Sequence, residues 1–355
     1  MRVLFDIGHP AHVHQFKNTI KRLRESGHEI MITARMRDIS FQLLDFYEIE
    51  YKQVGRLKKG LVNKLFGLVE TDIELLSIAK KFNPDILVGG SGNMYVSHVS
   101  WLLGKVSFIF EDTEHAQEQI LMYLPFTDFI VTPSSYLDDY GPKHIRYNGF
   151  HELAYLHPDI FSPDQSVLTK VGLKPNEPYA LLRFISWDAS HDLGIKRFSN
   201  QEKREIINVV EKYARPVISI ESSVPDEFKK YQIEMPPHYI HDLMYYSKMY
   251  IGEGATMALE CVCLGVPVIY INPLSAGILK EVQNYNLLEQ TTDLQVLKNI
   301  IDKYLNNPMV NSEQKEHSTN FLKDKINVTD FYVGLIENYP KSIKDYKAKI
   351  HGGSI

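Results

Sequence analysis

The stretch GEGATMALECVCLGVP, residues 252–267, decides the fold class of this chain. MYIGEG at 249–254 predicts a strand that leads into it, the segment 256–264 predicts a helix, and VPVIYI at 266–271 predicts the next strand. Strands this apolar are typical of a parallel sheet that helices cover on both faces. The stretch therefore predicts one βαβ unit of a doubly wound α/β domain.

The turn that opens this predicted helix is a candidate ligand site. Gly254, Ala255, Thr256 and Met257 lie where a helix N-terminus leaves backbone N–H groups unpaired, and such groups bind phosphate without a Walker lysine. Glu260, one turn further on, is a carboxylate among apolar neighbours and needs a partner. Vicinal ribose hydroxyls would be such a partner, and a structural contact within the protein is the alternative.

The same alternation of apolar strands and helices extends in both directions along the chain. In the second half, strands are predicted at 179–184 and 216–220 around a helix at 200–213. In the first half, strands are predicted at 2–7, 29–34, 51–54, 85–90, 106–110 and 129–132. The sequence thus predicts two doubly wound, Rossmann-like domains that face a central cleft, with the ligand groups at the carboxyl ends of the strands.

Domain boundaries follow from length and composition. A chain of 355 residues exceeds what one hydrophobic core usually serves, and four of its 17 prolines fall near the middle of the chain. We predict an N-terminal domain over 1–160, a linker over 161–178 and a C-terminal domain over 179–330. The last helix, in 331–355, is predicted to cross back to the first domain and to end in a frayed tail.

Composition excludes several classes of protein. The 39 Lys and Arg residues are outnumbered by 44 Asp and Glu residues, so the net charge of −5 does not favour nucleic acid as a partner. The two cysteines, Cys261 and Cys263, point to different faces of the predicted helix, which excludes a disulfide framework. No stretch reaches the roughly 18 apolar residues that a membrane span requires. We therefore expect a cytoplasmic protein.

Histidines crowd the loop GHPAHVHQF, residues 8–16, which follows the first predicted strand. Gly8 allows backbone to approach a ligand closely, and His9 lies beside it. His12 is the preferred general base for a sugar hydroxyl, because an imidazole titrates near neutral pH. Capping of the helix is the alternative role for these histidines. Their spacing matches no standard zinc pattern, so no metal is predicted.

Charged side chains follow two further predicted strands. In EDTEHA, residues 111–116, Glu111 and Glu114 are candidate catalytic carboxylates that could orient a histidine. An acidic helix cap is the alternative. In RFISWDASHD, Arg183 and Ser186 are candidate contacts for a diphosphate. A structural ion pair of the arginine with a nearby aspartate is the alternative.

These motifs, together with RYNGFHELAYLHP at 146–158, resemble the uncharacterised family numbered 354 among domains of unknown function. The resemblance extends over most of the chain. That family is similar to GT-B enzymes, including UDP-N-acetylglucosamine 2-epimerases and the N-acetylglucosaminyltransferase of peptidoglycan synthesis. The resemblance implies a GT-B fold, a ribose-binding role for Glu260 and a phosphate-facing turn at Ala255 to Met257. It also matches His12 to a histidine of the transferase and Glu111 to a catalytic glutamate of the epimerases.

Two departures favour glycosyl transfer over epimerisation. GGSGN at 89–93 lacks the carboxylate of the epimerases' Gly-Asp-Thr, and GHPAHVH replaces their Gly-Thr-Arg-Pro-Glu. The sequence therefore predicts a metal-independent glycosyltransferase of surface polysaccharide or glycoconjugate synthesis. Its substrate would be a nucleotide-sugar, UDP-linked, and it would need no cofactor. A 2-epimerase-like enzyme and a non-catalytic nucleotide-sugar-binding protein are the alternatives.

The expected partners are this donor and a sugar or lipid-linked acceptor. RLKKGLVNKLFGLVE at 56–70 mixes lysines with apolar residues, a pattern that would suit peripheral contact with a membrane. The start of a packed helix is the commoner role of such a segment. The sequence leaves a homodimer open.

Overall fold

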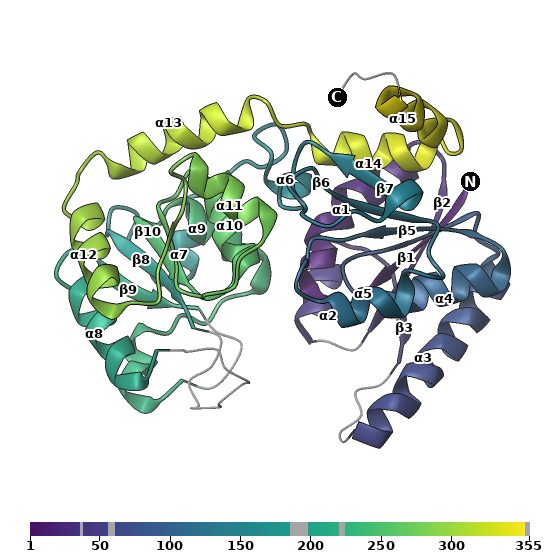
Figure 1. The fold of residues 1–355 in the computed structure, drawn as a ribbon. Helices are drawn as coiled ribbons and strands as arrows, with labels where there is room; N and C mark the ends of the chain where they lie inside the picture. The colour runs from purple at the N-terminus through teal and green to yellow at the C-terminus, as the bar shows by residue number, and fades with distance from the viewer. Residues whose placement is uncertain (36–37, 56–60, 185–197, 220–223, 352–355) are drawn as a thin grey trace. The chain divides into compact units, whose positions relative to one another are not determined.

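The structure, a computed structural model, is described for residues 1–35, 38–55, 61–184, 198–219 and 224–351. It divides into two compact units (Figure 1). Unit 1 comprises Met1–His157 and Ile326–Ile355, and unit 2 comprises Pro158–Lys325. The last helices of the chain therefore group with the first sheet, although they follow unit 2 in the sequence.

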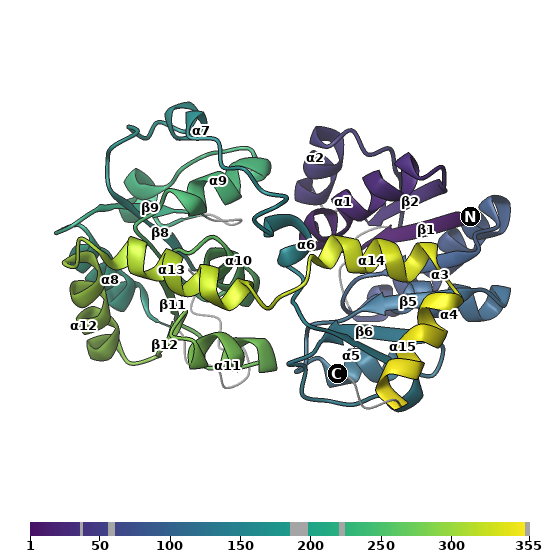
Figure 2. The same ribbon diagram turned by 90° about the horizontal axis from the view of Figure 1, so that it is seen from above.

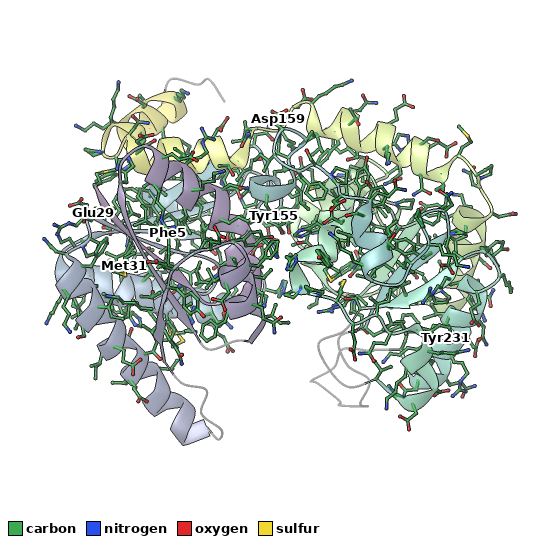
Figure 3. The ribbon with its side chains drawn as sticks, turned by 180° about the vertical axis from the view of Figure 1, so that it is seen from behind. Phe5, Glu29, Met31, Tyr155, Asp159 and Tyr231 are labelled. Atoms are coloured by element: carbon green, nitrogen blue, oxygen red, sulfur yellow. The ribbon has the colours of Figure 1, made fainter. Side chains whose placement is uncertain are left out.

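Unit 1 is built on seven parallel strands in the order β3-β2-β1-β4-β5-β6-β7. Phe5 and Met31, labelled in Figure 3, lie on the neighbouring strands β1 and β2, and Phe5 is completely buried. The chain order reverses between β1 and β4, which is where ligands bind in open sheets of this kind. The strands are β1 (Arg2–Ile7), β2 (Glu29–Arg35), β3 (Lys52–Val54), β4 (Ile86–Gly89), β5 (Val106–Phe110), β6 (Phe129–Pro133) and β7 (His144–Tyr147).

Helices cover both faces of this sheet (Figures 1 and 2). One layer contains α1, α6 and α14 with α2 and α15 beside them, and the other contains α3, α4 and α5. Successive strand residues serve the two layers in turn: Leu4 packs with the α3 to α5 layer, whereas Phe5 contacts Phe16 of α1. The helices are α1 (Pro10–Glu25), α2 (Asp38–Phe46), α3 (Leu61–Phe82), α4 (Met94–Leu103), α5 (Gln117–Tyr123), η1 (Gly141–Lys143), α6 (Leu153–Leu156), α14 (Val328–Glu337) and α15 (Lys341–His351).

Unit 2 has a parallel sheet in the order β12-β11-β10-β8-β9, and its chain order reverses between β8 and β10. The strands are β8 (Tyr179–Arg183), β9 (Arg215–Ile218), β10 (Met249–Gly252), β11 (Val268–Tyr270) and β12 (Glu289–Gln290). On one face α8 and α12 bury apolar residues such as Ile206 and Ile301. The predicted class, α/β with two doubly wound parallel sheets, is confirmed.

The helices of unit 2 include several that the sequence did not predict. Residues 161–178, predicted as a linker, belong to this unit and contain α7, whose Val167 and Leu168 are buried. The helices are α7 (Ser166–Lys170), α8 (Asn200–Val210), η2 (Asp226–Tyr231), η3 (Pro237–Tyr239), α9 (Ile240–Tyr245), α10 (Ala255–Cys263), α11 (Gly277–Asn284), α12 (Leu294–Leu305) and α13 (Val310–Leu322).

We predict that Gly265, which follows α10, is required for stability for two separable reasons. Its φ of +67° strains any other residue, and a β-carbon there would lie 2.9 Å from Lys315 Cα. Gly172, at φ +76°, has the same strain but no atom within 4 Å of its β-carbon position. Gly172→Ala should cost about 1–2 kcal/mol, and Gly265→Ala about 1–3 kcal/mol more from overpacking. Equal losses in urea unfolding would contradict the packing argument.

Candidate functional site

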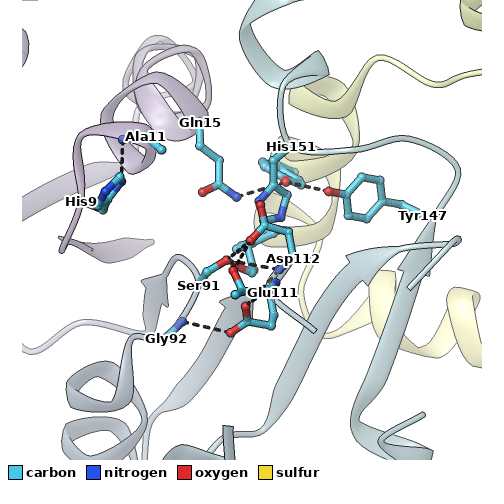
Figure 4. Close-up of polar contacts among 12 residues, drawn as sticks. His9, Ala11, Gln15, Ser91, Gly92, Glu111, Asp112, Tyr147 and His151 are labelled. Carbon is cyan, nitrogen blue, oxygen red and sulfur yellow. Dashed lines mark hydrogen bonds and ion pairs between the residues drawn. The ribbon is translucent and has the colours of Figure 1, made fainter. Parts of the chain in front are cut away.

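Three loops of unit 1 meet at the carboxyl edge of its sheet, because β4 lies between β1 and β5. The loop after β1 contains His9 and leads into α1, which carries His12, the loop after β4 is Gly90 to Gly92, and the loop after β5 begins with Glu111 and Asp112. Figure 4 shows the polar contacts that join the loops after β4 and β5, and the contact of His9 with Ala11 next to β1. These loops lie at the carboxyl ends of the strands, where the sequence predicted ligand groups, and the strand order reverses between β1 and β4.

His9, the N-cap of α1, and His12, in its first turn, have different roles. His9 is exposed and caps α1, since its Nδ1 accepts a hydrogen bond from Ala11 N at 3.2 Å. His12 is 6% exposed, and its ring packs on Gly90, where a β-carbon would lie 2.6 Å from Nε2. His9 is therefore a helix cap, and His12 lies beside the loop after β4, where the strand order of the sheet reverses.

The protonation of His12 follows from its surroundings. Burial, and then the neighbouring charges of His9 and Arg35, lower the pKa of His12 well below its ordinary value, although Asp112 acts in the opposite direction. The ring is therefore neutral at pH 7. Its Nδ1 accepts a hydrogen bond from Gly8 N at 3.3 Å, so the single ring hydrogen is on Nε2. His12 is held as a donor through Nε2.

Arg35 occupies the space beside Gly8. Its guanidinium lies 4.7 Å from the centroid of the Tyr95 ring, and Nη1 is 3.5 Å from Asp6 Oδ2. A β-carbon at Gly8 would fall 1.5 Å from Arg35 Nη2. The glycine thus makes room for this arginine, whereas the sequence predicted that it makes room for a ligand.

Glu111 accepts four hydrogen bonds that hold the loops together. Its Oε2 accepts hydrogen bonds from Gly92 N at 3.0 Å and from the Tyr123 hydroxyl at 2.5 Å. Its Oε1 accepts from Asp112 N at 3.1 Å and from Thr113 N at 2.9 Å. Burial and the charge of Asp112 raise the pKa of Glu111, and these hydrogen bonds oppose the shift. This geometry gives Glu111 a structural task in place of the catalytic one that the sequence predicted.

Glu114 also fixes backbone. It is 9% exposed, and its Oε1 accepts a hydrogen bond from Leu137 N at 2.9 Å, which ties the loop after β5 to the loop after β6. This contact gives Glu114 a role in holding the two loops in place. Both predicted carboxylates therefore bind backbone amides of these loops.

Asp112, which was not among the predicted site residues, pairs with a histidine. Its Oδ2 lies 3.1 Å from His151 Nδ1, and 30% of its side chain is exposed. Its Oδ1 accepts from Ser91 Oγ at 2.5 Å and from Thr113 Oγ1 at 2.9 Å. Burial would raise the pKa of Asp112, but the charge of His151 and these hydrogen bonds outweigh it and lower the pKa below its ordinary value. Asp112 is therefore ionised.

In unit 2 the predicted phosphate groups share one sheet edge. Arg183 ends β8 and pairs in register with Gly252, the last residue of β10. Its backbone oxygen accepts from Glu253 N at 3.1 Å, and its Nη1 donates to Ser219 Oγ at 3.3 Å. Gly254 is the N-cap of α10, where no side chain of the described residues provides a capping hydrogen bond.

The remaining predicted contacts of unit 2 behave differently. Ala255, Thr256 and Met257 form the first turn of α10 and are half-buried. Ser186 lies outside the described residues. Glu260 is 5% exposed, and its Oε1 is 2.9 Å from His241 Nε2 of α9. The structure thus supplies the internal partner that the sequence had left as the alternative for Glu260.

Two wider features of the described chain bear on chemistry. No group of three or more histidine, cysteine, aspartate or glutamate residues within it is arranged to hold a metal ion. Across the same ranges, no helix is both long and apolar enough to span a membrane.

A family model described as a protein of unknown function, DUF354, matches residues 1–338. The chain is 24% identical over 322 residues to an uncharacterized protein of Methanocaldococcus jannaschii, a match that covers 86% of this chain and 92% of that protein.

Solved structures share the fold at low sequence identity. MnaA of S. aureus, solved with UDP, has a TM-score of 0.69 at 10% identity and covers 97% of this chain and 98% of its own. UDP-GlcNAc 2-epimerase from Neisseria meningitidis, bound to UDP-GlcNAc, has a TM-score of 0.65 at 12% identity, with 91% and 99% covered. A Streptomyces glycosyltransferase, SsfS6, has a TM-score of 0.59 at 13% identity, with 95% and 100% covered. These likenesses confirm the predicted GT-B fold.

We predict that Glu111→Gln destabilises the chain. The glutamine keeps one oxygen, but its amide nitrogen would face N–H and O–H donors, and each buried donor left without an acceptor costs about 1–3 kcal/mol. Glu118→Gln, on the exposed side of α5, is the matched control and should change stability by less than about 0.5 kcal/mol. Equilibrium urea unfolding followed by circular dichroism measures both. Equal midpoints would show that the carboxylate is not needed.

Proposed function

Since the chain belongs to the DUF354 family of proteins of unknown function, we propose from its own residues that it is a nucleotide-sugar-dependent glycosyltransferase. It would use a UDP-linked sugar as donor and transfer the sugar to a hydroxyl of a sugar or lipid-linked acceptor, in the synthesis of surface polysaccharides or glycoconjugates. No metal ion and no further cofactor take part in the proposed reaction.

One observation in unit 2 carries the donor assignment. Arg183 and the turn before α10 lie on the two strands between which the chain order reverses, and they are paired in register. A guanidinium and the first amides of a helix at one edge suit the two phosphates of a nucleoside diphosphate. Because charge grows on the diphosphate as the glycosidic bond breaks, the same groups would stabilise the transition state.

Glu260 is the proposed ribose contact behind this turn. Its hydrogen bond from His241 fixes the carboxylate through Oε1, and a ribose hydroxyl would have to share the group with that histidine. The first turn of α10 and Glu260 lie about one helical turn apart. This spacing suits a ribose attached to the diphosphate.

Unit 1 supplies the acceptor side of the proposal. Its switch point holds a neutral imidazole, His12, beside an ionised carboxylate, Asp112, and a second imidazole, His151. Groups of this kind move protons near neutral pH. Transfer to a hydroxyl needs one proton acceptor, and this cluster contains the candidates for it.

Donor binding is tested by thermal denaturation with UDP, UMP and UDP-N-acetylglucosamine. A ligand at about 100 times its dissociation constant stabilises the folded chain by roughly 2.7 kcal/mol. We expect UDP and the nucleotide-sugar to raise the melting temperature more than UMP, because UMP lacks the second phosphate.

Two arginine variants make the same measurement specific. Arg183→Gln should remove most of the shift. Arg204→Gln, an exposed α8 arginine paired with Glu227, should keep it. If no nucleoside diphosphate raises the melting temperature of the unaltered chain, the donor assignment is wrong.

The reaction class is tested by incubating the chain with UDP-N-acetylglucosamine and no acceptor. A transferase releases UDP slowly, by transfer to water, and leaves the configuration of the remaining donor unchanged. An epimerase accumulates the 2-epimer, which nuclear magnetic resonance of the sugar protons detects. A protein that only binds the nucleotide-sugar leaves it intact. Formation of the 2-epimer would replace the transferase proposal.

A further inference from the structure

His151 differs from other histidines of unit 1 that pair with an aspartate. His98 Nδ1 is 3.1 Å from Asp72 Oδ2, and its Nε2 is 3.2 Å from the backbone oxygen of Met122. His144 Nδ1 is 3.3 Å from Asp139 Oδ1, and its Nε2 is 2.8 Å from Thr132 Oγ1. Both rings therefore have partners for both nitrogens, as expected of structural histidines.

The second nitrogen of His151 has no such partner. Its Nδ1 is 3.1 Å from Asp112 Oδ2, but its Nε2 is buried without a hydrogen-bond partner among the residues that the structure describes. A buried polar atom left in this state costs free energy and calls for an explanation beyond packing. The simplest explanation is a ligand group that completes the pair.

The carboxylate decides which nitrogen of His151 would meet that ligand. Because Asp112 is ionised and accepts a hydrogen bond, Nδ1 of a neutral His151 ring carries the hydrogen, and Nε2 carries the lone pair. Ser91 and Thr113 hold the other oxygen of Asp112, and the ring of His151 lies at 10° to that of Tyr147. These contacts fix the orientation of the imidazole ring and its tautomer. The buried Nε2 is then a proton acceptor.

His12 has the opposite tautomer. The amide of Gly8 donates to its Nδ1, which leaves the hydrogen on Nε2. An imidazole in that tautomer donates to an oxygen and is not ready to take a proton. The two histidines of the site therefore offer complementary groups, a donor at His12 and an acceptor at His151.

We propose that His151 is the general base of the transfer reaction, with Asp112 as its positioning residue, and that His12 instead donates a hydrogen bond to an oxygen at the site. This inference rests on the proposed function. Nε2 of His151 is buried in the structure, so the proposal requires the surrounding side chains to move when the acceptor hydroxyl binds. Contacts of this kind often close only when the substrate is bound.

The step balances as follows. The acceptor oxygen attacks the anomeric carbon of the donor sugar and forms the new glycosidic bond, while its proton passes to Nε2 of His151. The bond from the anomeric carbon to the diphosphate oxygen breaks, and its electron pair leaves with the nucleoside diphosphate. The resulting imidazolium is paired with the Asp112 carboxylate, and it returns the proton to solvent after the product departs.

The first test needs no activity. Long-range ¹H–¹⁵N spectra of the histidine-labelled chain report the tautomer of each ring, and the variants His151→Gln, His12→Gln and His98→Gln assign the three signals. At a pH where both rings are neutral, we expect hydrogen on Nδ1 alone for His151 and on Nε2 alone for His12. Hydrogen on Nε2 of a neutral His151 would overturn the proposal.

The second test measures UDP release from UDP-N-acetylglucosamine with water as acceptor. His151→Gln should lower kcat about 10²–10⁴-fold, the usual contribution of a general base, and Asp112→Asn should lower it by at least about 10²-fold. The KM and the melting shift with UDP should be unchanged, because the donor is bound in unit 2. His98→Gln removes an equivalent His–Asp pair and should leave kcat unchanged.

The outcomes separate the two proposals. If no nucleotide raises the melting temperature, the proposed function fails. If the donor binds and is turned over but folded His151→Gln keeps its kcat, the base assignment alone fails. A donor that binds and is never turned over also overturns the base assignment. Full activity of Asp112→Asn would leave His151 without its positioning residue and overturn that part.

Discussion

The site in unit 1 depends on the buried carboxylate of Glu111. Four donors from the loops after β4 and β5 and from α5 converge on it, so the spacing of these loops is set by one side chain. Asp112 follows it directly, and its position is therefore fixed from behind. A loop held in this way loses little further freedom when a ligand arrives, which favours binding. In the proposed mechanism, Glu111 holds these loops and takes no part in the reaction.

In unit 2 the polar groups at the sheet edge come from the N-terminus of α10. The Tyr250 hydroxyl is buried beneath the glycine turn, where a β-carbon at Gly252 would lie 2.1 Å from it. Glycine therefore lets the turn close over the tyrosine and keep its amides at the edge of the sheet. Glu260, held by His241, lies behind the same turn. In both units a buried side chain supports the loops where the strand order reverses. This side chain is Glu111 in unit 1 and Tyr250 in unit 2.

The sequence predicted the strands best where burial makes them uniformly apolar. The predicted strands at 2–7 and 106–110 coincide with β1 and β5, because every position between two helical layers favours the same residues. β7 (His144–Tyr147) was not predicted, since HIRY carries two basic residues and resembles a loop. Residues 8–16 were predicted as a loop, but α1 begins at Pro10, because proline suits the first turn of a helix.

The site was predicted less well, because the choice among neighbouring carboxylates is made by long-range contacts. EDTEHA places three acids in four positions, and nothing local distinguishes them. The fold buries Glu111 against backbone donors and turns Asp112 towards His151, 39 residues away in the sequence. The one available signal was that histidine, which lies in a motif already singled out for its resemblance. Burial leaves His12 neutral, and hydrogen bonds leave Asp112 ionised, so the charges at this site also depend on contacts between segments far apart in the sequence.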